Sequence, residues 1–320
     1  MSLIEQATRR LEQLKRAGIE VPTWDTGVAA KDAPPEPAKV EPRTEPRTEP
    51  KAAPKAQPQR GVRALRPATG NALVQVGQRQ SKSVQADLGA LANAGYLVPG
   101  SPRSALADEF RAIKQPLLKN ARSDADAPVR QGNLIMVSSA LAGEGKTFCA
   151  LNLALSIASE VDHSVLLVDA DVVRPAMVQR LGLSGQYKGL LDLLTDPKLD
   201  LSEVILKTNV PKLSVLPAGT PRINSTELLG SNSMQELLQD IANRYADRIV
   251  IFDTPPLLAT TESKVLAERM GQILIVVNEG ITPKAELTQA FNALQACPIV
   301  LALLNRSTHS VERQQYGYGN

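Results

Sequence analysis

The sequence contains no hydrophobic run long enough to cross a membrane. A membrane-spanning helix needs about 20 consecutive apolar residues, whereas the longest apolar runs here have the length of a β-strand, as at 299–304. Residues 1–18 alternate charged and apolar side chains and lack the apolar segment of a secretory signal. Both absences lead us to expect a cytoplasmic protein.

Cysteine is scarce, and neither sign of charge dominates. Cys149 and Cys297 form no C-x-x-C pair with each other or with the two histidines, which excludes a disulfide scaffold and a zinc framework. We expect both cysteines to be small core residues. The 36 lysines and arginines stand against 33 acids and are interleaved with them, giving a net charge of +3. A basic stripe of the kind that binds nucleic acid is missing, so we expect no nucleic acid partner.

Large apolar residues are almost absent from the segment 31–60. It holds eight prolines, mixed charges and a four-residue repeat, E-P-R-T, at 41–44 and 45–48. Such a composition cannot bury a core and favours an extended, solvated tether. We therefore predict a disordered linker over 21–87.

A short amphipathic helix is predicted before this linker, over 1–20. Ser2 and Glu5 fit a capping box at its start. Its apolar stripe consists of Ile4, Ala7, Leu11 and Leu14. A stripe of this kind needs a partner, and three remain open: another protein, a membrane surface, or the chain's own folded domain.

The stretch 137–147, V-S-S-A-L-A-G-E-G-K-T, has the features of a phosphate-binding loop. It follows an apolar run and precedes residues 148–155, whose apolar side chains recur at helical spacing. The glycines allow backbone N–H groups to face phosphates, Lys146 can reach the β and γ oxygens, and the Thr147 hydroxyl can bind Mg²⁺. Ala140 replaces the usual first glycine, but a plain turn between strand and helix would not need G-K-T. We predict an ATP or GTP site.

Two further apolar runs end in carboxylates. The run 165–168 stops at Asp169 and Asp171, and the run 249–252 stops at Asp253. In an open α/β sheet, ligands lie at the carboxyl ends of the strands. Asp253 is therefore the expected Walker B carboxylate that holds the Mg²⁺ shell.

The remaining pattern predicts an α/β fold of the P-loop NTPase class. Further strands are predicted at 212–217, 273–277 and 299–304, and they alternate with helices at 233–245 and 284–295. Apolar strands that alternate with amphipathic helices indicate a mostly parallel sheet covered on both faces. We expect this domain to span 88–310.

A helix is also predicted over 104–118. Leu106, Phe110, Ile113 and Leu117 share its apolar face. The opposite face presents Asp108, Arg111 and Lys114, which could be no more than a solvated charged face. After the folded domain, the polar tail 311–320 carries Tyr316 and Tyr318, whose hydroxyls we expect to be exposed.

These motifs together resemble those of the bacterial tyrosine kinases. Residues 142–147, the Asp169-Ala170-Asp171 strand end with Arg174-Pro175, and 252–256 are similar to that family's Walker A, A′ and B motifs. Asp108, Arg111 and Lys114 resemble its E-x-x-R-x-x-R assembly motif, and Tyr316 and Tyr318 its autophosphorylated cluster. The resemblance extends over 86–320 and is nearest to the cytoplasmic autokinases of exosortase-type exopolysaccharide clusters. Two departures are Val173, where many relatives have Arg, and the shortness of the tyrosine cluster.

The resemblance implies an ATP- and Mg²⁺-dependent autokinase that regulates exopolysaccharide polymerisation and export. It further implies a transmembrane chain-length regulator as activator, a ring-like homo-oligomer in which one tail enters the next subunit, and a cognate tyrosine phosphatase. Association with the inner membrane would then be peripheral, through the partner. The tail, about 15 residues beyond the last strand, reaches at most ~50 Å.

Roles follow for individual residues under this resemblance. The nucleotide-binding set is Gly143, Glu144, Gly145, Lys146, Thr147, Phe148 and Asn305, with Asn305 at the position that reads the adenine edge or, alternatively, an ordinary strand-end turn residue. Thr147, Asp171 and Asp253 would hold Mg²⁺, and Lys146 would neutralise the phosphates. Asp169 is the candidate that orients the tyrosine hydroxyl and accepts its proton, although a free carboxylate is a weak base.

Two other interpretations remain open. A switch ATPase of the partition or cell-division type shares the fold and the loop, but it usually carries a lysine early in the loop, where this chain has Leu141. It also has no use for a tyrosine-bearing tail. An inactive scaffold is the third interpretation, which the full set of phosphate and metal ligands disfavours.

Overall fold

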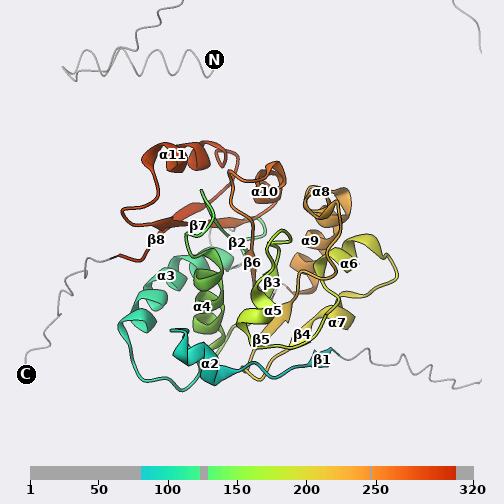
Figure 1. Ribbon diagram of the computed structural model, residues 1–320, viewed down its shortest axis with the longest axis horizontal. Coiled ribbons are helices and arrows are strands. Elements are labelled where there is room, and N and C mark those ends of the chain that lie inside the picture. Colours follow the sequence, from blue (N-terminus) through green and yellow to red (C-terminus); the bar gives the residue numbers. More distant parts are fainter. Residues whose placement is uncertain (1–80, 123–128, 246, 308–320) are drawn as a thin grey trace, which may run out of the picture. The chain divides into compact units, whose positions relative to one another are not determined.

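The computed structural model describes residues 81–122, 129–245 and 247–307 (Figure 1). The expected N-terminal helix at 1–20, the expected linker up to residue 80, and the tail with Tyr316 and Tyr318 lie outside these ranges.

The described strands form one sheet in the order β1-β4-β5-β3-β6-β2-β7-β8. They are Lys82–Ser83 (β1), Leu134–Ser139 (β2), Ser164–Asp169 (β3), Leu206–Lys207 (β4), Leu213–Leu216 (β5), Arg248–Asp253 (β6), Gln272–Asn278 (β7) and Val300–Asn305 (β8). Neighbouring strands are parallel except for β4 and β5, which are antiparallel. The predicted mostly parallel α/β sheet is thus confirmed.

Helices cover both faces of this sheet (Figure 1). They are α2 (Leu88–Asn93), α3 (Ala105–Ala121), α4 (Lys146–Ala158), α5 (Met177–Arg180), α6 (Leu190–Thr195), α7 (Leu201–Val204), α8 (Ser225–Leu229), α9 (Asn232–Arg244), α10 (Thr261–Ala267) and α11 (Lys284–Asn292). The predicted helices at 104–118, 233–245 and 284–295 correspond to α3, α9 and α11. Among the described helices, none combines the length and the apolar character that a membrane span requires.

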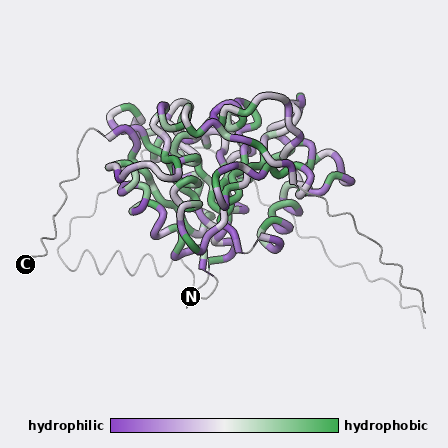
Figure 2. Tube along the Cα trace, turned by 90° about the horizontal axis from the view of Figure 1, so that it is seen from below, coloured by the Kyte–Doolittle hydropathy of each residue, from purple (hydrophilic) through white to green (hydrophobic). Residues whose placement is uncertain are grey.

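Successive strand residues point to opposite faces and so build two hydrophobic cores. On β2, Ile135 and Val137 pack with α2, α3 and α4, whereas Leu134 and Met136 pack with α6, α9 and α10. All four side chains are fully buried. Figure 2 shows the hydrophobic segments concentrated inside the domain, as expected for strands covered on both faces.

The sheet includes residues that the expected linker 21–87 contained. In β1, Lys82 and Ser83 pair with β4, and the Asn209 side chain exchanges hydrogen bonds with the backbone of Ala86 at 2.8 and 3.1 Å. Both strand residues are exposed, so β1 carries no alternation of apolar and polar residues that could reveal it. The folded domain therefore begins before residue 88.

Candidate active site

The phosphate-binding loop leaves the carboxyl end of β2, which lies between β6 and β7 in the middle of the sheet. Gly145 is the N-cap of α4 and has a φ of 95°, a left-handed conformation that suits glycine. Lys146 opens the helix and is only 7% exposed. The loop and the first N–H groups of α4 thus face the edge at which parallel sheets bind ligands.

Contacts from the segment after β7 and from the end of β8 hold this loop in place. The Glu144 carboxylate accepts hydrogen bonds from the Leu141 N–H, at 2.8 Å, and from the Thr282 hydroxyl. The Asn305 side chain at the end of β8 donates to the Glu144 carbonyl oxygen at 2.9 Å. Glu144 is 3% exposed, so it offers a ligand its backbone rather than its side chain. Thr282 carries no motif that could have predicted this contact.

Ala140 fits the place of the usual first glycine without strain. It is fully buried, and its carbonyl oxygen accepts a hydrogen bond from the Leu258 N–H at 3.3 Å. Its φ is not positive, unlike those of Gly143 and Gly145. A side chain is therefore tolerated here, and the loop keeps its shape despite the departure from the usual motif.

The structure brings Asp253 close to the loop. It ends β6 and is fully buried, and neither carboxylate oxygen has a hydrogen-bond partner in good geometry among the described residues. Burial raises the pKa of Asp253 to about 7, although the nearby Thr147 hydroxyl and Lys146 ammonium act in the opposite direction. Buried carboxylate oxygens without a partner are unusual, and a cation would satisfy them.

Asp169 ends β3 directly beside Asp253, its register partner on β6. One carboxylate oxygen accepts a hydrogen bond from the Met177 N–H at the start of α5, at 3.0 Å, while the other is buried without a partner in the described part of the chain. Burial and the neighbouring Asp253 raise the pKa of Asp169 to about 8. This carboxylate is thus a stronger base than a free aspartate.

Asp171 lies two residues further, at the rim of the same edge. It is 8% exposed and accepts a hydrogen bond from the Arg174 N–H at 3.1 Å. Burial raises its pKa. Asp171 and Asp253 do not converge with a third ligand tightly enough to hold a metal by themselves, since the described residues contain no such cluster. They fit Mg²⁺, which binds through one or two carboxylates together with phosphates and water.

A cavity of about 510 Å³ opens over the loop. It is lined by Gly143, Gly145, Lys146, Thr147, Phe148, Arg180, Asn305 and Arg306. Six of these residues belong to the predicted nucleotide-binding set. Arg180 and Arg306 do not, because no local motif distinguishes them from other surface arginines.

A second cavity, of about 750 Å³, begins on the other side of Asp169. Its walls come from residues 175–188 and from the loop 217–221 that follows β5. No sequence motif covers residues 178–188 or the loop 217–221. Of the predicted site residues, Asp169 is the one that lines this second cavity.

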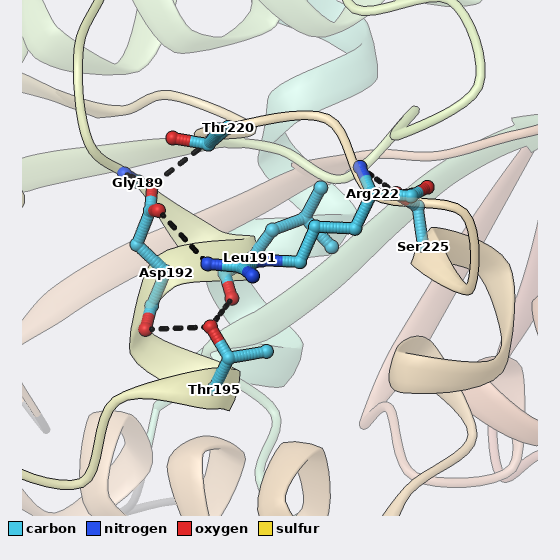
Figure 3. Close-up of polar contacts among 7 residues, drawn as sticks. All are labelled: Gly189, Leu191, Asp192, Thr195, Thr220, Arg222 and Ser225. Carbon is cyan, nitrogen blue, oxygen red and sulfur yellow. Dashed lines mark hydrogen bonds and ion pairs between the residues drawn. The ribbon is translucent and has the colours of Figure 1, made fainter.

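Asp192 of α6 fastens the loop 217–221 (Figure 3). Its carboxylate accepts hydrogen bonds from the N–H groups of Gly189, at 2.9 Å, and Thr220, at 3.0 Å, and forms an ion pair with Arg222 at 3.7 Å. Gly219 has a φ of 91°, and a Cβ atom there would lie 2.6 Å from the Asp192 carboxylate. The wall of the second cavity is thus held by one buried acid.

Comparison with known proteins identifies the family. Residues 132–296 match the AAA domain family. The tyrosine-protein kinase YwqD of Bacillus subtilis (strain 168) is 32% identical over 219 residues, covering 68% of this chain and 87% of YwqD. The chain belongs to the bacterial tyrosine kinase family.

Two other family members each match more than half of the chain. The tyrosine-protein kinase ptk of Acinetobacter johnsonii is 34% identical over 190 residues, which are 59% of this chain and 25% of ptk, so the chain spans about a quarter of that relative. The kinase domain of the Escherichia coli tyrosine kinase ETK is 29% identical, with a TM-score of 0.57, and the match covers 69% of this chain and 83% of the ETK domain. This bacterial tyrosine kinase thus shares sequence and fold with solved kinase domains.

The structure corrects the predicted assembly face of this bacterial tyrosine kinase. Asp108 and Arg111 lie on the exposed side of α3, where they form an ion pair at 3.8 Å. Lys114 does not join them, since it is 4% exposed and points into the domain. Its ammonium donates to the Ser156 carbonyl oxygen at 2.8 Å and pairs with Glu160 at 2.5 Å. Helical spacing alone predicts an exposed charge at Lys114, but tertiary packing against α4 buries it.

Proposed function

We propose that this protein is an ATP-dependent protein-tyrosine autokinase that phosphorylates Tyr316 and Tyr318 in its own tail. The observation that carries the proposal is the position of Asp169. This buried carboxylate neighbours Asp253 of the nucleotide site and also lines the second cavity. A phenol that entered that cavity would meet the candidate base beside Asp253 of the nucleotide site.

The described residues supply the parts that phosphoryl transfer needs. Lys146 and the loop N–H groups neutralise the β and γ phosphates of ATP, and Asn305, close to Gly145, borders the remainder of the nucleotide. Mg²⁺, held by Thr147 with Asp171 and Asp253, would neutralise the charge that develops during transfer. The tyrosine oxygen bonds to the γ phosphorus as the bond to ADP breaks.

The phenolic proton passes to Asp169. The raised pKa of this carboxylate brings it nearer to the phenol's pKa of about 10 than a free aspartate would be. Proton transfer late in the reaction is then sufficient, since phosphoryl transfer is largely dissociative. The hydrogen bond from the Met177 N–H orients this carboxylate, which lines the second cavity.

Its biological setting follows from the family. We propose that the kinase regulates exopolysaccharide polymerisation and export, that a transmembrane chain-length regulator activates it at the inner membrane, and that a tyrosine phosphatase reverses its action. The exposed pair Asp108 and Arg111 would contribute to a homo-oligomer in which one tail enters the next subunit's second cavity. Each phosphate would add about −2 charge to the tail and favour its release.

Mass spectrometry of the purified full chain with Mg-ATP tests the activity. We expect phosphate on Tyr316 and Tyr318 in the wild type, none in Lys146→Met, and none at the tail in Tyr316→Phe/Tyr318→Phe. The cytoplasmic end of a membrane activator is added in a parallel sample. Hydrolysis of ATP without any phosphotyrosine in both samples would contradict the kinase assignment and indicate a switch ATPase of the partition type.

A further inference from the structure

We infer that Arg180 and Arg306 form a clamp on the phosphate chain of the nucleotide, opposite the phosphate-binding loop. We call these two residues the arginine clamp. This inference rests on the nucleotide site of the proposed function and adds to it two residues that none of the sequence motifs contains. Both line the cavity over the loop, together with Lys146 and Thr147.

Arg180 belongs to α5, the helix that also hydrogen-bonds to the candidate base Asp169. It ends α5, whose first residue, Met177, donates its N–H to Asp169. The Arg180 side chain is exposed and lines the same cavity as Lys146 and Thr147. A guanidinium at this position can approach the phosphates from the side that the loop leaves open.

An aromatic pair, the buried Tyr96 and the half-buried Phe148, lies next to Arg180. The rings of Tyr96 and Phe148 pack with their centroids 5.1 Å apart, and Phe148 follows Thr147 in the loop helix. The Tyr96 hydroxyl is buried and lies next to the Arg180 guanidinium, although no partner in good hydrogen-bonding geometry is present among the described residues. Arg180 thus lies next to an aromatic pair, one member of which, Phe148, lines the nucleotide cavity.

Arg306 enters the cavity from the end of β8. Its φ is 57°, a left-handed conformation that residues other than glycine adopt rarely and that recurs at ligand sites. The backbone is held there because the Arg306 N–H donates to the Asn305 side-chain oxygen at 2.9 Å, while the Asn305 amide donates to the Glu144 carbonyl. One amide side chain therefore fixes both the loop and the placement of Arg306.

The charges around the cavity favour a polyanion. Its lining contains three cationic side chains, from Lys146, Arg180 and Arg306, and no carboxylate. Neither arginine forms an ion pair with an acid in the described part of the chain. The volume of about 510 Å³ lies within the range of ligand sites. Arginine binds phosphate through paired N–H groups, which gives direction as well as charge.

Isothermal titration of the full chain with Mg-ATP, ADP and adenosine tests the clamp. The variants are Arg180→Gln, Arg306→Gln and the double change, with Arg130→Gln as a matched control, because Arg130 is an exposed arginine that lines a different cavity. We expect each clamp variant to weaken ATP and ADP binding about tenfold, the effect of losing one charge-assisted contact, and to leave adenosine binding unchanged. Arg180→Lys should recover part of the loss.

Each of the other outcomes contradicts a different part of the proposal. If the clamp variants bind ATP as tightly as the wild type while Lys146→Met does not, the clamp is wrong and the nucleotide site stands. If adenosine binding falls as much as ATP binding, the arginines shape the cavity and do not contact phosphates. If the wild type binds no ATP at all, the proposed function fails as well. Thermal unfolding of every variant shows whether a loss of nucleotide binding comes from misfolding. If Arg180→Gln misfolds, nucleotide binding by the more conservative Arg180→Lys variant tests the role of Arg180.

Discussion

The Lys114 ammonium donates a hydrogen bond to the Ser156 carbonyl oxygen, 2.8 Å away, and so joins α3 to the last turn of the phosphate-loop helix α4. The same ammonium pairs with Glu160, and this pairing is the main reason that the pKa of Glu160 is lowered. A cation is favourable at this end of a helix, where carbonyl groups lack partners. The helix that begins at the nucleotide is therefore anchored at its far end by α3.

Replacing Lys114 should lower stability much more than replacing its neighbour Arg111. Lys114→Met keeps the apolar stem but leaves the Ser156 carbonyl without its donor, and we expect a loss of about 1–3 kcal/mol. Arg111→Met removes only an exposed pair and should cost less than about 0.5 kcal/mol. Urea unfolding of the full chain measures both. Equal midpoints for the two variants would mean that the buried contact contributes nothing.

Gly145→Ala should disrupt nucleotide binding through a collision with Asn305. A Cβ atom at residue 145 would lie 2.2 Å from the Asn305 side-chain nitrogen, whereas one at Gly143 would meet nothing within 4 Å. Both glycines have positive φ, so Gly143→Ala is the control for backbone strain alone. We expect ATP affinity, measured by titration, to fall further in Gly145→Ala, and adding Asn305→Ala to recover part of it. Identical losses in the two alanine variants would exclude the collision.

Asp192→Ala should impair use of the tail more than use of ATP. The change leaves the N–H groups of Gly189 and Thr220 without acceptors and releases the wall 217–221 of the second cavity. We expect a raised KM for a peptide copy of 308–320, an unchanged KM for ATP, and partial recovery in Asp192→Asn, which keeps one acceptor oxygen. Asp196→Ala, an exposed change in the same segment, is the control. An increase in both KM values would assign Asp192 a purely structural role.

Acid should destabilise the domain through Asp200. Hydrogen bonds from Ser202, followed by those from Arg244, lower the pKa of Asp200 to about 2. A carboxylate with a lowered pKa in the folded state contributes stability above its unfolded pKa of about 4, and this contribution is lost as pH falls towards 2. After allowance for screening by solvent, the contribution is about 1–2 kcal/mol. The free energy of chemical unfolding should differ less between pH 7 and pH 3 in Asp200→Asn than in the wild type. An unchanged difference would contradict the assignment, and Arg244→Gln should give an intermediate value.

The sequence was sufficient for features that depend on local patterns. The loop before Lys146 combines a motif with a strand and a helix on either side, and Asp169 and Asp253 each follow an apolar run, so parallel pairing alone brings them to one edge. The same logic predicted the sheet, because strands buried on both faces are apolar throughout.

Features that depend on distant partners were not predictable in this way. Lys114 has helical spacing with Asp108 and Arg111, but only the position of α4 decides that it is buried. Arg180 and Arg306 reach one cavity from two distant segments of the chain, and neither belongs to a motif. The short helices α5 to α8 have at most six residues each, too few for apolar periodicity to be evident.

The pairing of β1 with β4 decides where a shortened chain can begin. A version starting at Leu88, the boundary suggested by composition, would leave the β4 edge without its neighbour and remove the backbone of Ala86 from the Asn209 side chain. Unpaired strand edges recruit other chains, so this version should aggregate during expression. A start at or before residue 80 would retain the protecting strand and yield a soluble domain for crystallisation.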